Sequence, residues 1–78
     1  MVAKPEPISK TEMTQIETYL RKLFGSQRLS VRARPKVKDS AEVYVGDEFI
    51  ATITVDEEDG SRDFQFQMTI LEMDLGEA

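Results

Sequence analysis

The chain of 78 residues contains no cysteine, no histidine and no tryptophan. Without cysteine it can form neither disulfides nor thiolate metal sites. Without histidine it lacks the usual proton shuttle near neutral pH, and neither a serine triad nor a cysteine-histidine pair can be assembled. The acidic residues 56–59 lie in a predicted exposed turn, where nothing raises a carboxylate pKa into the range of a general acid. We therefore predict a protein that is not an enzyme and binds no cofactor.

The same acidic turn invites a calcium interpretation, because hard cations prefer carboxylate oxygens. An EF-hand loop that began at Asp56 would need glycine at its sixth position and a bidentate glutamate at its twelfth. Gly60 falls at the fifth position instead, and Gln67 occupies the twelfth. The motif fails, so we predict a polar hairpin turn and no metal site.

Long apolar runs are also missing. No stretch approaches the roughly 20 apolar residues that span a bilayer, and residues 1–10 lack the apolar centre of a signal peptide. We expect a soluble cytoplasmic protein without membrane contact. A chain this short buries only roughly 60% of the surface that its unfolded form exposes, so dimerisation is the obvious source of extra stability.

The net charge of −5 hides an uneven distribution. Residues 1–38 carry nine Lys or Arg against three Glu, whereas residues 39–78 carry one Arg against twelve acids. Such asymmetry hints at nucleic-acid contact. The simpler interpretation, which we favour, is that basic and acidic strands pair beside each other in one sheet.

The first structured element is predicted to be a helix of about four turns. Residues 1–8 contain two prolines and no apolar periodicity, so we predict that they are disordered. Ser9 and Glu12 match a capping box, although Thr11 could serve as the cap instead. Apolar side chains then recur at helical spacing until Gly25, a residue type that commonly ends helices.

Four later segments alternate apolar and polar side chains at the period of two of an extended strand. They cover residues 28–34, 41–45, 49–55 and 64–70, joined by short polar connections. We predict an α+β domain over residues 9–75 in the order α-β-β-β-β: one N-terminal helix packed on a four-stranded antiparallel meander sheet. We predict a C-terminal tail at residues 76–78, and the pattern of residues 72–78 leaves strand, helix and tail open.

One face of this sheet should pack on the helix and the other should remain open. Strict alternation places Phe49, Phe64 and Phe66 on the helix side and Ile50 on the open side. The residues that we expect to take part in interactions are Arg28, Arg32, Arg34, Glu42, Tyr44 and Ile50. We predict a small protein-interaction module that binds a protein partner or a second copy of itself through the open face or a sheet edge.

The alternative is weak binding of RNA or single-stranded DNA by the basic first strand. Its arginines share one face, and same-face neighbours lie about 7 Å apart, which suits a phosphate backbone. Single-strand binders add aromatic stacking platforms, and the exposed face offers only Tyr44. We therefore rank nucleic acid below protein as the partner.

Three strings in the chain resemble a family of short uncharacterised alphaproteobacterial proteins that is catalogued as a domain of unknown function. The strings are residues 19–25 (YLRKLFG), residues 40–50 (SAEVYVGDEFI), and Asp59-Gly60 followed by residues 64–68 (FQFQM). The likeness extends over residues 13–75. It implies a free-standing bacterial cytoplasmic domain, and it implies no activity, ligand or catalytic residue.

Overall fold

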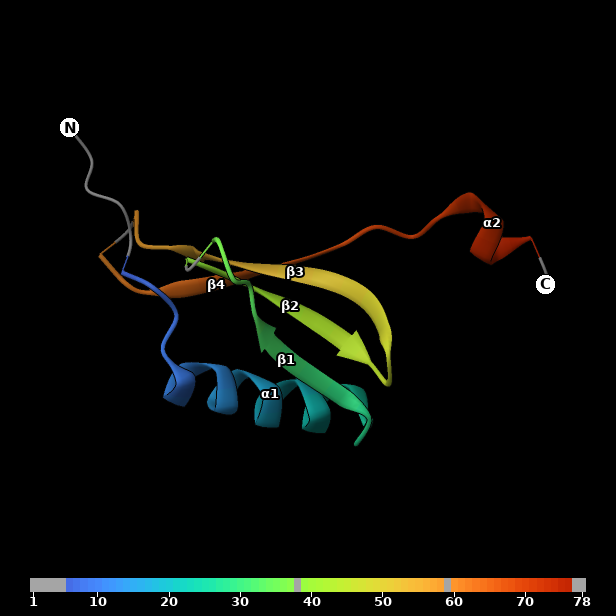
Figure 1. The fold of residues 1–78 in the computed structure, drawn as a ribbon, viewed down its shortest axis with the longest axis horizontal. Coiled ribbons are helices and arrows are strands. Elements are labelled where there is room, and N and C mark those ends of the chain that lie inside the picture. Colours follow the sequence, from blue (N-terminus) through green and yellow to red (C-terminus); the bar gives the residue numbers. More distant parts are fainter. Residues whose placement is uncertain (1–5, 38, 59, 77–78) are drawn as a thin grey trace.

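The computed structural model describes residues 6–37, 39–58 and 60–76. Its elements are α1 (Lys10–Phe24), β1 (Leu29–Ala33), β2 (Ser40–Val45), β3 (Glu48–Asp56), β4 (Asp63–Met68) and α2 (Glu72–Leu75). The four strands form one antiparallel sheet in the order β1-β2-β3-β4, with α1 beneath one face (Figure 1). The predicted α-β-β-β-β meander is confirmed.

Both ends of α1 are formed by local sequence signals. The Ser9 hydroxyl accepts from the Glu12 amide at 3.0 Å, and the Glu12 carboxylate accepts from the Ser9 amide at 3.0 Å, so the predicted capping box is present. Gly25 ends the helix with φ 64°, a left-handed conformation that glycine adopts without steric cost.

The residue before the N-terminal cap Ser9 is also packed in the structure. Residues 1–5 of the segment predicted to be disordered lie outside the described residues, but Ile8 is buried in the core. Met13, at the fourth helical position, packs against the same cluster. Apolar residues at these two positions form a hydrophobic staple, which directs the chain into the helix.

The core lies between α1 and the inner face of the sheet. Its buried members are Ile8, Leu20, Leu29, Ala41, Val43, Ala51 and Ile53. Val43 pairs with Ala51 across β2 and β3, and Ile53 pairs with Phe66 across β3 and β4. Phe64 and Phe66 are half-buried and pack against this cluster, on the side that the alternation predicts.

A β-bulge interrupts the predicted alternation in β3. Val43 pairs with Ala51, yet the next residue, Tyr44, pairs with Phe49, so Ile50 is the additional residue. Phe49 is 52% exposed and its ring meets Tyr44, whereas Ile50 packs against the core. The prediction that Phe49 faces the helix and Ile50 faces solvent is therefore wrong, because the extra residue reverses the alternation for the part of β3 that precedes Ala51.

The helix covers only part of the inner face. It packs mainly along the edge strand β1 and leaves the β3 and β4 side of that face less covered (Figure 1). None of the described helices is both long and apolar enough to span a membrane.

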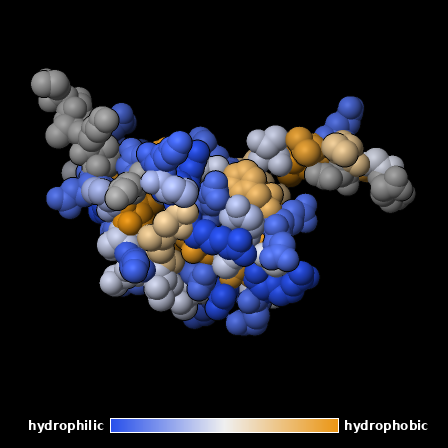
Figure 2. Space-filling model, viewed as in Figure 1, coloured by the Kyte–Doolittle hydropathy of each residue, from blue (hydrophilic) through white to orange (hydrophobic). Residues whose placement is uncertain are grey.

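After β4 the chain continues away from this body. The molecule measures 47 × 25 × 24 Å, and α2 lies beyond the end of the sheet (Figure 1). Residues 72–75 are thus a short helix, one of the alternatives that the sequence left open. Apolar side chains are visible both on the body and along this projecting segment (Figure 2).

Candidate functional site

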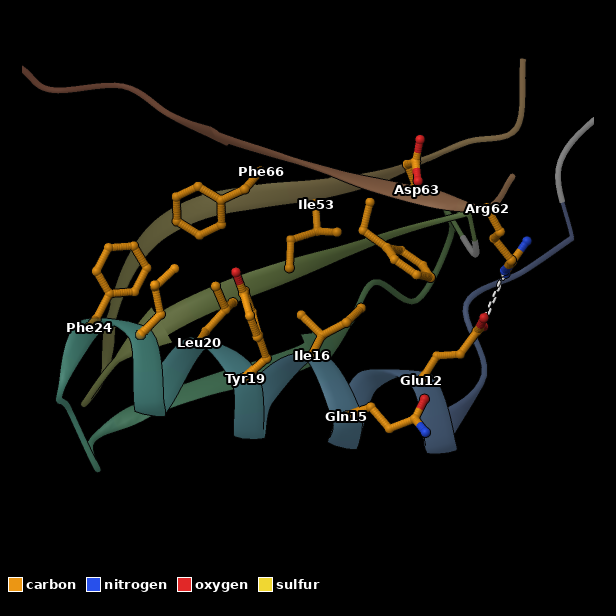
Figure 3. A pocket seen from close by; sticks show the side chains of 12 residues that line it. Glu12, Gln15, Ile16, Tyr19, Leu20, Phe24, Ile53, Arg62, Asp63 and Phe66 are labelled. Carbon is orange, nitrogen blue, oxygen red and sulfur yellow. Dashed lines mark hydrogen bonds and ion pairs between the residues drawn. The ribbon is translucent and has the colours of Figure 1, made fainter. Parts of the chain in front are cut away.

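A groove of about 510 Å³ lies between α1 and the last two strands (Figure 3). Its apolar lining comprises Ile16, Tyr19, Leu23 and Phe24 from α1 and Phe64 and Phe66 from β4. The buried Leu20 and Ile53 form its floor, and Phe24 closes one end against Phe66 with ring centroids 5.9 Å apart.

Several apolar side chains of α1 that line this groove are largely exposed. Tyr19, Leu23 and Phe24 are 56–62% exposed, although they continue the helical stripe that packs on the core. They remain exposed because the helix packs mainly on β1, at the edge of the sheet. The groove is therefore an extension of the core that is open to solvent.

The other end of the groove is closed by an ion pair. Arg62 donates from Nε to Glu12 Oε2 at 2.7 Å and from Nη2 to Glu12 Oε1 at 3.0 Å (Figure 3). These hydrogen bonds, with the one from the Ser9 amide, lower the pKa of Glu12 from 4.5 to about 2, and the same carboxylate raises the pKa of Arg62. Glu12 is thus fully ionised at neutral pH, which makes it a poor proton donor or acceptor there.

Arg62 also joins segments that are distant in the sequence. Its guanidinium donates to Glu57 at 2.9 Å and to the carbonyls of Glu6 and Pro7 at 3.0 and 2.9 Å. The sequence predictions missed this residue. One signal was available: Arg62 is the single basic residue between positions 39 and 78, among twelve acids.

The open face brings together four of the residues predicted for interaction. The Arg32 guanidinium lies 4.0 Å from the centroid of the Tyr44 ring, and the Tyr44 hydroxyl donates to Glu42 at 3.1 Å. Arg34 approaches the other Glu42 oxygen at 3.9 Å. The hydrogen bond to Glu42 raises the pKa of Tyr44. Phe49, which the sequence analysis did not place here, meets Tyr44 edge-on with centroids 5.7 Å apart.

The other two predicted residues lie apart from this cluster. The Arg28 guanidinium lies against Gly46 in the β2-β3 turn, in the space that a Cβ atom on residue 46 would occupy. Ile50 packs on the core because of the bulge. The arginines of the first strand therefore do not form one uniform row: Arg32 and Arg34 engage Tyr44 and Glu42, and Arg28 lies beside a turn.

The groove combines a largely apolar surface with charged side chains at one end. Among the described residues no group of three or more acidic side chains is placed to hold a metal ion. The groove has one ionised pair at one end, an aromatic pair at the other and apolar walls between them. Such a surface fits an apolar segment with a polar terminus or flank.

Comparison with known proteins adds one family. The family described as protein of unknown function (DUF3126) matches residues 12–74. The chain belongs to this family. The span matched by DUF3126 contains every residue that lines the groove, and the predicted resemblance to an uncharacterised family is confirmed. No curated protein and no solved structure matches the chain.

Proposed function

We propose that this DUF3126 protein is a small non-enzymatic protein-interaction module that binds an apolar protein segment in the groove between α1 and β4. The observation that carries the proposal is the exposed wall formed by Tyr19, Leu23 and Phe24. These three large side chains are more than half exposed, although they lie next to the core and continue its apolar surface. Contiguous apolar surface of this kind typically marks a protein-binding site.

The groove supports binding better than the open sheet face does. On the open face, Arg32, Glu42 and Tyr44 already contact one another, so a partner would have to compete with intramolecular contacts. In the groove, a partner would displace water mainly from apolar side chains, which is favourable by about 25 cal/mol for each Å² of apolar surface that becomes buried.

The alternative, nucleic-acid binding by the first strand, has weaker support. The guanidinium of Arg32 stacks on Tyr44, and that of Arg34 lies near Glu42, whose carboxylate would repel a phosphate. Since binding to nucleic acid scales with the number of phosphates neutralised, such engaged arginines contribute less.

Affinity capture of the tagged full chain from its own cells tests the proposal. Leu23→Glu places a charge on the exposed wall of the groove, and Val37→Glu, at an exposed apolar residue before β2, is the matched control. We expect a retained protein with wild type and Val37→Glu and at least about tenfold less with Leu23→Glu, which corresponds to 1.4 kcal/mol.

Two outcomes contradict the proposal. One is a retained protein whose amount does not change with Leu23→Glu. The other is retention of nucleic acid alone, lost at high salt, which would favour the first-strand alternative.

A further inference from the structure

The C-terminal segment, residues 69–76, carries apolar side chains that its own body does not cover. Ile70, Leu71, Met73 and Leu75 are 49–76% exposed. Its one helical turn, α2, has Leu71 at the N-cap position, which provides no side-chain cap, and it lies away from the sheet (Figure 1). Because an isolated turn of helix is unstable in water, α2 needs a surface to pack on.

The dimensions of this segment match those of the groove. The groove runs along α1 from Glu12 to Phe24, twelve helical steps or about 18 Å. Three extended residues, 69–71, and the four residues of α2 together span about 16 Å.

Charge contributes little to the match between the segment and the groove. Residues 69–76 carry a net charge of −2, and the charged residues that line the groove are Glu12, Arg62 and Asp63. Of the two basic residues in the last turn of α1, Lys22 is exposed, whereas Arg21 donates to the Leu29 carbonyl at 2.7 Å and pairs with Glu17. The fit therefore rests on the apolar side chains of both surfaces.

The direction of the chain favours a groove on another molecule. β4 passes the C-terminal end of α1, where Phe66 meets Phe24, and the chain then continues outward (Figure 1). A return to its own groove would need a tight reversal just after Met68. Residues 67–71 contain no glycine, proline, asparagine or aspartate, which are the residues that favour such a turn.

We propose that two copies of this chain exchange their C-terminal segments, so that residues 69–76 of each copy fill the groove of the other. This inference rests on the proposed function of the groove and names its occupant. The contact is reciprocal, since each copy supplies one segment and one groove, and it closes at two copies. Each exchange would cover the exposed apolar side chains of both the segment and the groove.

The test measures the mass of the full chain by light scattering after size exclusion, from low to high micromolar concentration. Three variants are compared. The segment variant carries both Met73→Glu and Leu75→Glu, the groove variant carries Leu23→Glu, and the control carries Val37→Glu. All these side chains are exposed, so the variants should fold, which circular dichroism checks. We expect a dimer for wild type and the control, and a dissociation constant raised by about a hundredfold or more for the other two.

A mixture of the segment variant and the groove variant is the decisive sample. Each variant alone has lost both contacts of the symmetric dimer. In the mixture, the intact segment of the groove variant can enter the intact groove of the segment variant, so one contact of the two is restored. We expect heterodimers at concentrations where each variant alone is monomeric.

Several results would overturn the exchange. They are a monomeric wild type at high micromolar concentration, a dimer that neither variant weakens, and a mixture that stays monomeric. A monomeric wild type that the segment variant destabilises would mean that the segment fills the groove of its own molecule. These results can rule out the exchange while Leu23→Glu still reduces the amount of captured protein. In that case the proposed function stands, with another protein as the partner.

Discussion

At the scale of single residues, Arg62 makes four polar contacts across fifty or more positions of the sequence. It links the start of β4 to the first turn of α1 through Glu12 and to the carbonyls before α1. Its side chain and that of Glu12 are only about one quarter exposed, and the contact is bidentate. A partly buried bidentate pair is more stabilising than an ordinary surface ion pair.

This pair predicts a dependence of stability on pH. The pKa of Glu12 is about 2 in the folded protein, against an ordinary value of 4.5. Between these values the unfolded state binds more protons, so the free energy of unfolding should fall as the pH is lowered from about 4.5 to about 2. Above pH 4.5 the stabilisation is fully present.

Glu12→Gln should reduce the free energy of unfolding at pH 7 by about 1–2 kcal/mol and remove much of this acid dependence. Urea unfolding at a series of pH values measures both effects. Glu48→Gln, at an exposed glutamate of β3, is the control. An equal acid dependence in Glu12→Gln and wild type would show that the ion pair does not cause it.

At the scale of elements, the bulge between β2 and β3 determines which side chains face the core. It directs Phe49 to the ring of Tyr44 and Ile50 to the core. The signal in the sequence is the run Phe49-Ile50-Ala51, three consecutive apolar residues in a strand that otherwise alternates. Alternation alone cannot indicate where the extra residue lies, because the position of a bulge depends on the pairing with β2.

The bulge predicts unequal costs for two neighbouring substitutions. Ile50→Thr removes apolar contacts with the core and places a hydroxyl there, so it should lower the free energy of unfolding by about 1–2 kcal/mol. Phe49→Thr loses chiefly the edge-on contact with Tyr44, and should cost under about 1 kcal/mol. Urea unfolding midpoints compare the two. The opposite order would mean that Phe49 faces the core.

At the scale of the whole molecule, one helix is too narrow for a four-stranded sheet. Helices pack about 10 Å from a neighbouring layer, and strands are spaced by about 4.8 Å, so a helix placed over β1 cannot also cover β4. The uncovered strip becomes the groove, and the exposed C-terminal segment has the dimensions to fill it. Domains of this size often depend on an additional source of stability, and the proposed exchange would supply one.

The proposed exchange predicts a melting temperature that depends on concentration. Binding of a second copy to the folded state stabilises that state by mass action, so a tenfold higher concentration should raise the Tm by about 3 °C or more. The variant with Met73→Glu and Leu75→Glu should show a Tm independent of concentration. Scanning calorimetry measures both, and a wild-type Tm that does not change with concentration would speak against association.

The predictions that succeeded depended on neighbours in the sequence. Ser9 and Glu12 are three residues apart, and Gly25 directly follows the last residue of α1. Those that failed depended on distant partners. Arg62 meets Glu12 across fifty positions, and the orientation of Ile50 depends on the register with β2.

By itself, the sequence determined the order of helix and strands, the ends of α1 and the apolar side of most strands, because caps, turns and periodicity act within a few residues. The tertiary structure alone decided where α1 lies across the sheet, and hence that Tyr19, Leu23 and Phe24 line an open groove instead of a closed core. The physical reason is that periodicity indicates which side chains avoid water, whereas packing geometry decides which of them a single short chain can cover.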